Sequence, residues 1–178
     1  RCDVALLIID ALEGVTEQDE HIAGFVLDEN KSLVIVVNKW DSVDKDSHTM
    51  SAFLDKVRER LHFVKYAPVI FISAMTGQRI HQVLETANRV YEARFLRLPT
   101  STVNKILREA VQRHPPPVKG TRRLKLYFGT QVKTNPPVFL FHTNDATLVH
   151  FTYKRFIENR IREMFPFEGT PLILSFRT

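Results

Sequence analysis

The chain has 178 residues, of which 44% are hydrophobic and 25% are charged, and its formal net charge at pH 7 is +5. This length allows one large domain or two small domains with hydrophobic cores. No run approaches the about 18 consecutive apolar residues of a membrane-spanning helix, and the first residues lack a signal-peptide pattern. For lack of such a run, no membrane partner is expected. A single cysteine, Cys2, excludes an internal disulfide framework, so a reducing, cytoplasmic setting is expected.

The charge is distributed unevenly between the two halves. Residues 1–97 hold 12 Lys and Arg and 15 Asp and Glu, a net charge of −3, whereas residues 98–178 hold 13 and 5, a net charge of +8. The asymmetry predicts two domains, the second of which faces an anionic partner. Nucleic acid is the leading candidate for this partner, and a merely soluble basic surface is the alternative.

Residues 1–97 alternate between buried strands and amphipathic helices. Unbroken apolar runs at 4–9, 33–37 and 69–72 are typical of parallel strands. Thr16 and Asp19 form a capping-box pattern at the start of the first helix. A further helix lies between the second and third strands, and a long helix after the third is predicted to reach Phe95. This β-α-β-α-β-α order predicts a doubly wound parallel sheet, an α/β fold.

Residues 98–178 follow a different order, α-β-β-α-β, and this order predicts an α+β domain. Ser101 is expected to cap the first helix, and His114-Pro115-Pro116-Pro117 ends it. The remaining elements are predicted from apolar periodicity: strands at 124–128, 138–141 and 172–176, and a helix at 153–165.

Asn38-Lys39-Trp40-Asp41 directly follows the apolar run at 33–37. Ligands of open α/β sheets bind at the carboxyl ends of the strands. The Asp41 carboxylate could accept hydrogen bonds from the N1–H and the 2-amino group of guanine. Adenine lacks these donors and would leave the carboxylate unpaired, at a cost of roughly 1–3 kcal/mol or more. The tetrapeptide therefore predicts guanine recognition.

Ser73-Ala74 follows the run at 69–72, and by itself it is typical of an ordinary strand-to-helix turn. After Asn38-Lys39-Trp40-Asp41, it resembles the fifth motif of the translation-factor-like GTPases, as the tetrapeptide resembles the fourth. The resemblance implies that the Ala74 N–H contacts guanine O6 and that the Lys39 stem covers the base. The implied GTP or GDP contacts are Asn38, Lys39, Asp41, Ser73 and Ala74.

The phosphate-binding half of such a site has no counterpart in the sequence. A GxxxxGK[ST] loop is absent, and so is the upstream Asp-x-x-Gly motif. We therefore expect an incomplete G domain that does not hydrolyse GTP alone, with no catalytic residue and with the Mg²⁺ ligands elsewhere in the complete protein. Asp10 is interpreted as a turn residue rather than a Mg²⁺ ligand, and histidine spacing does not favour a zinc site.

Six runs along the chain together carry a family resemblance: 10–19, 36–41, 71–78, 114–117, 153–155 and 165–171. On these runs, the whole chain resembles the C-terminal portion of the Der (EngA) family, GTPases with two consecutive G domains. The resemblance implies part of the second G domain at 1–97, a KH-like domain at 98–178, and a GTP-dependent role in assembly of the large ribosomal subunit.

The second half has no GXXG loop, the element with which KH domains normally clamp RNA. Its absence fits the Der family and argues against the Era type, whose KH domain keeps the loop. The remaining alternative is a nucleotide-independent RNA- or protein-docking module with a vestigial G domain. The candidate contacts to ribosomal RNA phosphates, or to the preceding G domain of the same protein, are Arg122, Arg123, Lys125, Lys154, Arg155 and Arg162.

Overall fold

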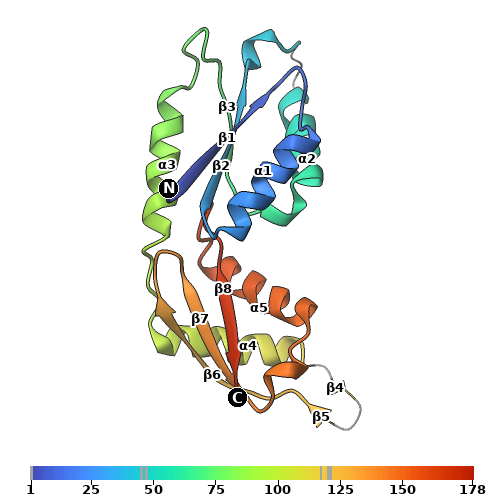
Figure 1. Cartoon of the computed structure of the whole chain (residues 1–178), viewed down its shortest axis with the longest axis vertical. Helices are drawn as coiled ribbons and strands as arrows, with labels where there is room; N and C mark the ends of the chain where they lie inside the picture. The colour runs from blue at the N-terminus through green and yellow to red at the C-terminus, as the bar shows by residue number, and fades with distance from the viewer. Residues whose placement is uncertain (1, 45, 47, 117, 120–121) are drawn as a thin grey trace. The chain divides into compact units, whose positions relative to one another are not determined.

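The computed structural model describes residues 2–44, 46, 48–116, 118–119 and 122–178 (Figure 1). Pro117 of the predicted proline motif lies outside these residues. The strands are β1 (Val4–Asp10), β2 (Ser32–Asn38), β3 (Val69–Phe71), β4 (Val118–Lys119), β5 (Arg122–Arg123), β6 (Leu126–Lys133), β7 (Val138–Thr143) and β8 (Ile173–Arg177). The α-helices are α1 (Glu17–Asp28), α2 (Thr49–Arg60), α3 (His81–Ala93), α4 (Thr100–Arg113) and α5 (Phe151–Met164). Short 3-10 turns occur at Trp40–Ser42, His62–Val64 and Ala146–Leu148.

The chain divides into two compact units. Unit 1 comprises Arg1–Ala93 and Glu168–Pro171, and unit 2 comprises Arg94–Phe167 and Leu172–Thr178. The sequence predicted a single boundary near residue 97, whereas the chain returns to unit 1 at residues 168–171, which we call the return segment. In this segment, the Gly169 carbonyl oxygen accepts from the Leu33 backbone N–H at 2.8 Å. The Gly169 N–H donates to the backbone carbonyl oxygen of Tyr66 at 2.8 Å.

Unit 1 is a parallel sheet with helices on both faces. The strand order is β1-β2-β3, and the register pairs Asp10 with Asn38 and Val37 with Phe71. One face contributes Leu7, Ile9, Leu33 and Ile35 to a core with α1 and α2, and the other packs Val34 and Val36 against Val90 of α3. Figure 1 shows α3 on one side of the sheet and α1 and α2 on the other. The predicted doubly wound α/β architecture is confirmed.

Unit 2 is a three-stranded sheet with α4 and α5 packed on one face. The order is β6-β7-β8, in which β6 and β7 are antiparallel and β7 and β8 are parallel. Phe139, Phe141 and Leu174 point from the sheet into a core shared with the two helices. The predicted α-β-β-α-β order is confirmed, and a two-residue ladder, β4 with β5, is added to it.

The helix boundaries correct two expectations. Ser101 does not cap α4, because the helix already begins at Thr100, after Pro99 in an extended conformation. The helix of unit 1 that was expected to reach Phe95 ends at Ala93. The predicted capping box of Thr16 is present, with both of its hydrogen bonds. The capping box of Thr16 thus located the start of α1. The start of α4 instead follows Pro99 directly.

Candidate functional site

The predicted nucleotide-binding residues lie where the three strands of unit 1 end. Asp10 and Asn38 are register partners at the ends of β1 and β2. Next to them, the chain after β3 is held by a hydrogen bond from the Ile72 N–H to the Val37 oxygen at 2.8 Å. Because all three strands are parallel, their carboxyl ends share one edge of the sheet, as the sequence predicted.

Asn38 joins the two predicted motifs directly. Its Oδ1 accepts a hydrogen bond from the Ala74 N–H at 3.0 Å. This N–H is the group that the resemblance assigns to guanine O6, so a bound base would share the donor with Asn38 or displace it. Ser73 is fully buried, and its Oγ accepts from the Thr76 N–H at 3.1 Å. Ser73 therefore shapes the loop, while the Ala74 backbone lies at its exposed surface.

Lys39 has a left-handed backbone, with φ of 60° and ψ of 31°. Its Nζ lies 2.6 Å from Oδ2 of Asp10. The hydrogen bond from Lys39 lowers the pKa of Asp10, and the same contact raises the pKa of Lys39. Asp10 also accepts from the Leu12 N–H at 2.8 Å. This contact agrees with the turn interpretation of Asp10, whereas its ion pair with Lys39 had no local sequence signal.

Trp40 anchors the tetrapeptide in the core. It is only 2% exposed, and its ring lies 4.5 Å from that of Phe71 and 5.6 Å from that of Phe53, centroid to centroid. The backbone N–H of Trp40 donates to the carbonyl oxygen of Ile72 at 3.0 Å. Asp41 follows in the 3-10 turn and remains partly exposed, with the Ser42 hydroxyl donating to its Oδ2 at 3.2 Å. The buried ring therefore fixes the backbone that carries the predicted base-reading carboxylate.

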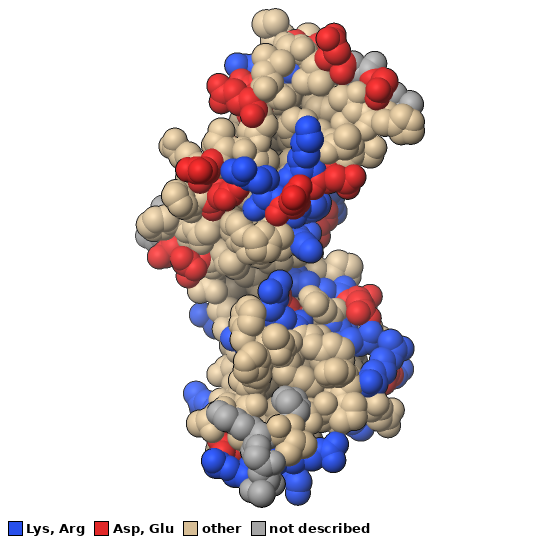
Figure 2. All heavy atoms as spheres, turned by 90° about the vertical axis from the view of Figure 1, so that its right-hand side faces the viewer, with Lys and Arg blue, Asp and Glu red and all other residues tan. Residues whose placement is uncertain are grey.

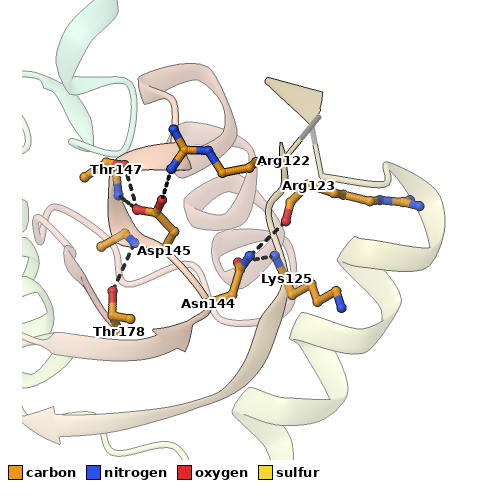
Figure 3. Close-up of polar contacts among 8 residues, drawn as sticks. Arg122, Arg123, Lys125, Asn144, Asp145, Thr147 and Thr178 are labelled. Carbon is orange, nitrogen blue, oxygen red and sulfur yellow. Dashed lines mark hydrogen bonds and ion pairs between the residues drawn. The ribbon is translucent and has the colours of Figure 1, made fainter. Parts of the chain in front are cut away.

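The basic segment of unit 2, which we define as residues 122–125, is held by Asn144 (Figure 3). Asn144 Oδ1 accepts from the Lys125 N–H at 2.7 Å, and its Nδ2 donates to the Arg123 oxygen at 3.0 Å. Arg122 forms an ion pair with Asp145, with Nη1 to Oδ2 at 3.3 Å. The side chains of Arg123 and Lys125 point away from this network in Figure 3. These two cations are therefore the better placed of the three for an external anion.

The candidates on α5 differ from one another in the same way. Arg162 Nε donates to Glu158 at 3.0 Å, and its Nη1 donates to the Pro166 oxygen at 3.1 Å, so this guanidinium holds the end of the helix. Arg155 lies over the ring of Phe151, at 5.3 Å from its centroid. Lys154 is exposed. Arg155 and Lys154 are therefore better placed than Arg162 for an external anion, because the Arg162 guanidinium is engaged in hydrogen bonds within the chain.

The surface view agrees with the uneven charge of the two halves of the sequence, a net −3 in residues 1–97 and a net +8 in residues 98–178. In Figure 2, Lys and Arg dominate the visible face of unit 2 in the lower half, whereas both signs are mixed on unit 1. Among the residues that the structure describes, no group of three or more His, Cys, Asp and Glu could hold a metal ion. Within the same residues, no helix is both long and apolar enough to cross a membrane.

Two family models match the chain. Residues 1–93 match the elongation factor Tu GTP-binding domain. Residues 97–177 match the C-terminal KH-domain-like region of EngA bacterial GTPase enzymes. The two matches cover the predicted order of an α/β G domain followed by a KH-like domain, and the predicted fold class is confirmed.

Curated relatives are similar over the full length of the chain. The proteins named GTPase Der from Chloroflexus aggregans and Moorella thermoacetica are each 52% identical to it, over 100% and 99% of its residues. That of Caldanaerobacter subterraneus is 49% identical over 98%. The chain spans about 40% of the length of each relative. A crystal structure of Aquifex aeolicus Era bound to GDP and AlF4⁻ is 21% identical, with a TM-score of 0.43 over 98% of this chain and 64% of that one.

Proposed function

The chain belongs to the Der (EngA) family of GTPases, and on this premise we propose that the ends of β2 and β3 read the guanine base of GTP or GDP. In the complete protein, this site would serve GTP hydrolysis during assembly of the large ribosomal subunit. A cytoplasmic setting belongs to the same proposal. It is supported by the similarity to proteins named GTPase Der and by the single cysteine of the chain.

The contact between Asn38 and Ala74 supports the guanine site most directly. It joins residues 36 positions apart into one edge, at 3.0 Å. Asp41 follows in the same turn and is partly exposed, and in this proposal its carboxylate accepts from N1–H and the 2-amino group. Lys39 remains 57% exposed at its side chain despite the ion pair with Asp10, and its stem can cover one face of the base.

The phosphates and Mg²⁺ belong to the complete protein in this proposal. The described residues supply base contacts, and the ion would be held with the phosphates by residues outside them. Bound there, Mg²⁺ would neutralise charge that develops on the transferred phosphoryl group. For the 178 residues alone, we expect very weak GDP binding, because base contacts without phosphate contacts recover only part of the affinity.

Base specificity tests the site in the complete protein. Asp41→Asn should weaken GDP binding and favour xanthosine diphosphate, because the new amide can donate to the C2 oxygen of xanthine. The preference for guanine over xanthine should fall by up to roughly 10⁴–10⁵-fold, the range of sites that depend on hydrogen bonds. Isothermal titration with both nucleotides measures this preference.

Asp44→Asn is the matched control, because Asp44 is an exposed carboxylate three residues further along the same loop. It should leave both affinities unchanged. Equal GDP affinity in the parent and in Asp41→Asn would refute the assignment of Asp41. Tight ribosome binding by a protein that binds neither nucleotide would instead favour the nucleotide-independent docking module.

We further propose that unit 2 docks on ribosomal RNA through the basic segment, with Lys154 and Arg155 as secondary contacts. The net charge of +8 in residues 98–178 supports an anionic partner. The Asn144 hydrogen bonds support a fixed position for Arg123 and Lys125. A neighbouring G domain of the same protein is the other partner that these cations could meet.

Charge reversal tests the docking proposal. Changing Arg122, Arg123 and Lys125 to Glu in the complete protein should reduce co-sedimentation with the large ribosomal subunit and flatten its salt dependence, because fewer counterions are released. The control changes Lys31, Lys56 and Lys65 of unit 1 to Glu, an equal change of net charge. Unchanged co-sedimentation of the first variant, or an equal loss in both, would remove the basic segment from the proposal.

Asn144→Ala offers a test that keeps every cation. It removes the side chain that holds the backbone at Arg123 and Lys125, so binding should weaken by less than after charge reversal. The salt dependence should stay close to that of the parent, because the number of phosphate contacts is the same. Amide hydrogen exchange at Lys125 should become faster, which checks that the clamp was lost.

A further inference from the structure

The face of the unit 2 sheet opposite α4 and α5 carries a cross-strand row of three residues: Phe128 of β6, His142 of β7 and Arg177 of β8. The register pairs Phe128 with His142, and His142 with Arg177. Side chains alternate between the two faces of a strand, and the neighbouring pair, Gly129 and Phe141, faces the helices. We call the row Phe128–His142–Arg177 the stacking row.

The two rings of the row form a close, nearly parallel pair. The centroids of Phe128 and His142 lie 4.3 Å apart, with an interplanar angle of 15°. Phe128 nevertheless remains 45% exposed, and Arg177 is exposed at the end of the row. By contrast, Phe139 and Phe141 on the helix side of the sheet are 0% and 1% exposed. An open aromatic pair beside a guanidinium is a surface on which an unpaired nucleobase can stack.

Cations lie on both sides of this aromatic pair along the sheet. Lys125 lies opposite Asn144, two residues beyond His142 along the chain, since the Asn144 N–H donates to the Lys125 carbonyl oxygen at 3.2 Å. Lys133 pairs with Val138 at the other end of β6. Both lysines are exposed. In the described part of the chain, neither lysine nor Arg177 forms an ion pair.

We propose that this sheet face binds single-stranded RNA, with an unpaired base stacked on the outer ring face of Phe128, whose other face packs on His142, and with phosphates at Lys125, Lys133 and Arg177. The inference rests on the proposed RNA-docking role of unit 2, and it names unpaired nucleotides as the ligand. It also supplies a recognition surface to a domain without a GXXG loop. The positive charge of residues 98–178 favours RNA over an apolar protein surface as the occupant.

Ring removal separates stacking from charge. In the 178-residue chain, Phe128→Leu keeps an apolar side chain and every cation, and Phe128→Tyr keeps the ring. Binding of a short single-stranded RNA is compared with binding of the duplex formed with its complement. Phe128→Leu should weaken single-strand binding about fivefold or more, the range for loss of one stacked base. It should leave duplex binding unchanged, and Phe128→Tyr should bind as the parent does.

Phe25→Leu is the matched control, because Phe25 is a 74% exposed phenylalanine on α1 of unit 1. It should change neither affinity. Parental single-strand affinity in Phe128→Leu, with a lower melting temperature, would overturn the inference and leave the aromatic pair a cross-strand packing contact. An equal loss of both RNA forms would overturn it too. If the parent binds no RNA at all, the docking proposal fails together with the inference.

Discussion

Gly169 of the return segment should tolerate no larger residue. Its φ is +65°, and a Cβ built there would lie 2.6 and 2.7 Å from the methyl groups of Val90 and 2.9 Å from the Leu33 oxygen. The left-handed conformation costs an L-residue about 1–2 kcal/mol, and overpacking of a close-packed site costs about 1–3 kcal/mol. Gly169→Ala should therefore lower the free energy of unfolding by roughly 2–5 kcal/mol.

The chain provides its own probe and control for this measurement. Trp40 is the one tryptophan, and it is buried in unit 1, so its fluorescence during urea unfolding reports on that unit. Gly14→Ala has the same backbone penalty, with φ of +73°, but nothing lies within 4 Å of the added Cβ. It should cost only about 1–2 kcal/mol. Equal losses in the two variants would refute the reasoning that the return segment is packed closely against β2 and α3.

Three further predictions follow from local contacts. Thr16→Ala removes the capping box of α1 and should cost about 0.5–2 kcal/mol of unfolding free energy in the same urea assay; no loss would contradict the cap. Lys39→Gln should raise the pKa of Asp10 toward its ordinary value, because the Lys39 hydrogen bond lowers it; an NMR titration that finds the same pKa in both proteins would contradict this. Tyr153 is buried, which raises its pKa to about 12, so the unfolded chain ionises first and stability falls as pH rises from about 10 toward 12. Tyr153→Phe should lessen that fall in alkaline unfolding curves, and identical curves would exclude the effect.

Much of the fold could be predicted because its signals are local. Unbroken apolar runs predicted β1, β2 and β3, and helical periodicity placed α1 to α5 within a few residues. The capping box of Thr16 needs only four consecutive residues and was correct in detail. Ser101 was wrong as the cap because two local signals competed, and α4 begins directly after the extended Pro99, two residues earlier than a cap at Ser101 requires.

The site could be predicted only in part for the same reason. Asn38 and Ala74 were assigned from their positions after two strands, and parallel pairing brings them within hydrogen-bonding distance. The partner of Lys39 was not predicted, because Asp10 lies on another strand, and only the register that pairs Asp10 with the adjacent Asn38 brings the two side chains together. Arg162 was predicted as a contact to RNA phosphates or to a neighbouring G domain, and its sequence position does not reveal that its guanidinium also holds the end of α5.

The sequence by itself determined the order of elements, the uneven charge and the position of the Asn38-Lys39-Trp40-Asp41 motif, because each depends on residue type and short spacing. Tertiary structure decided which residues meet across long separations. It placed Asn144 against the basic segment, returned Gly169 to unit 1, and aligned Phe128, His142 and Arg177 on one sheet face. Such contacts depend on strand register and on chain reversals, and a one-residue change in register would move every side chain of a strand to the opposite face.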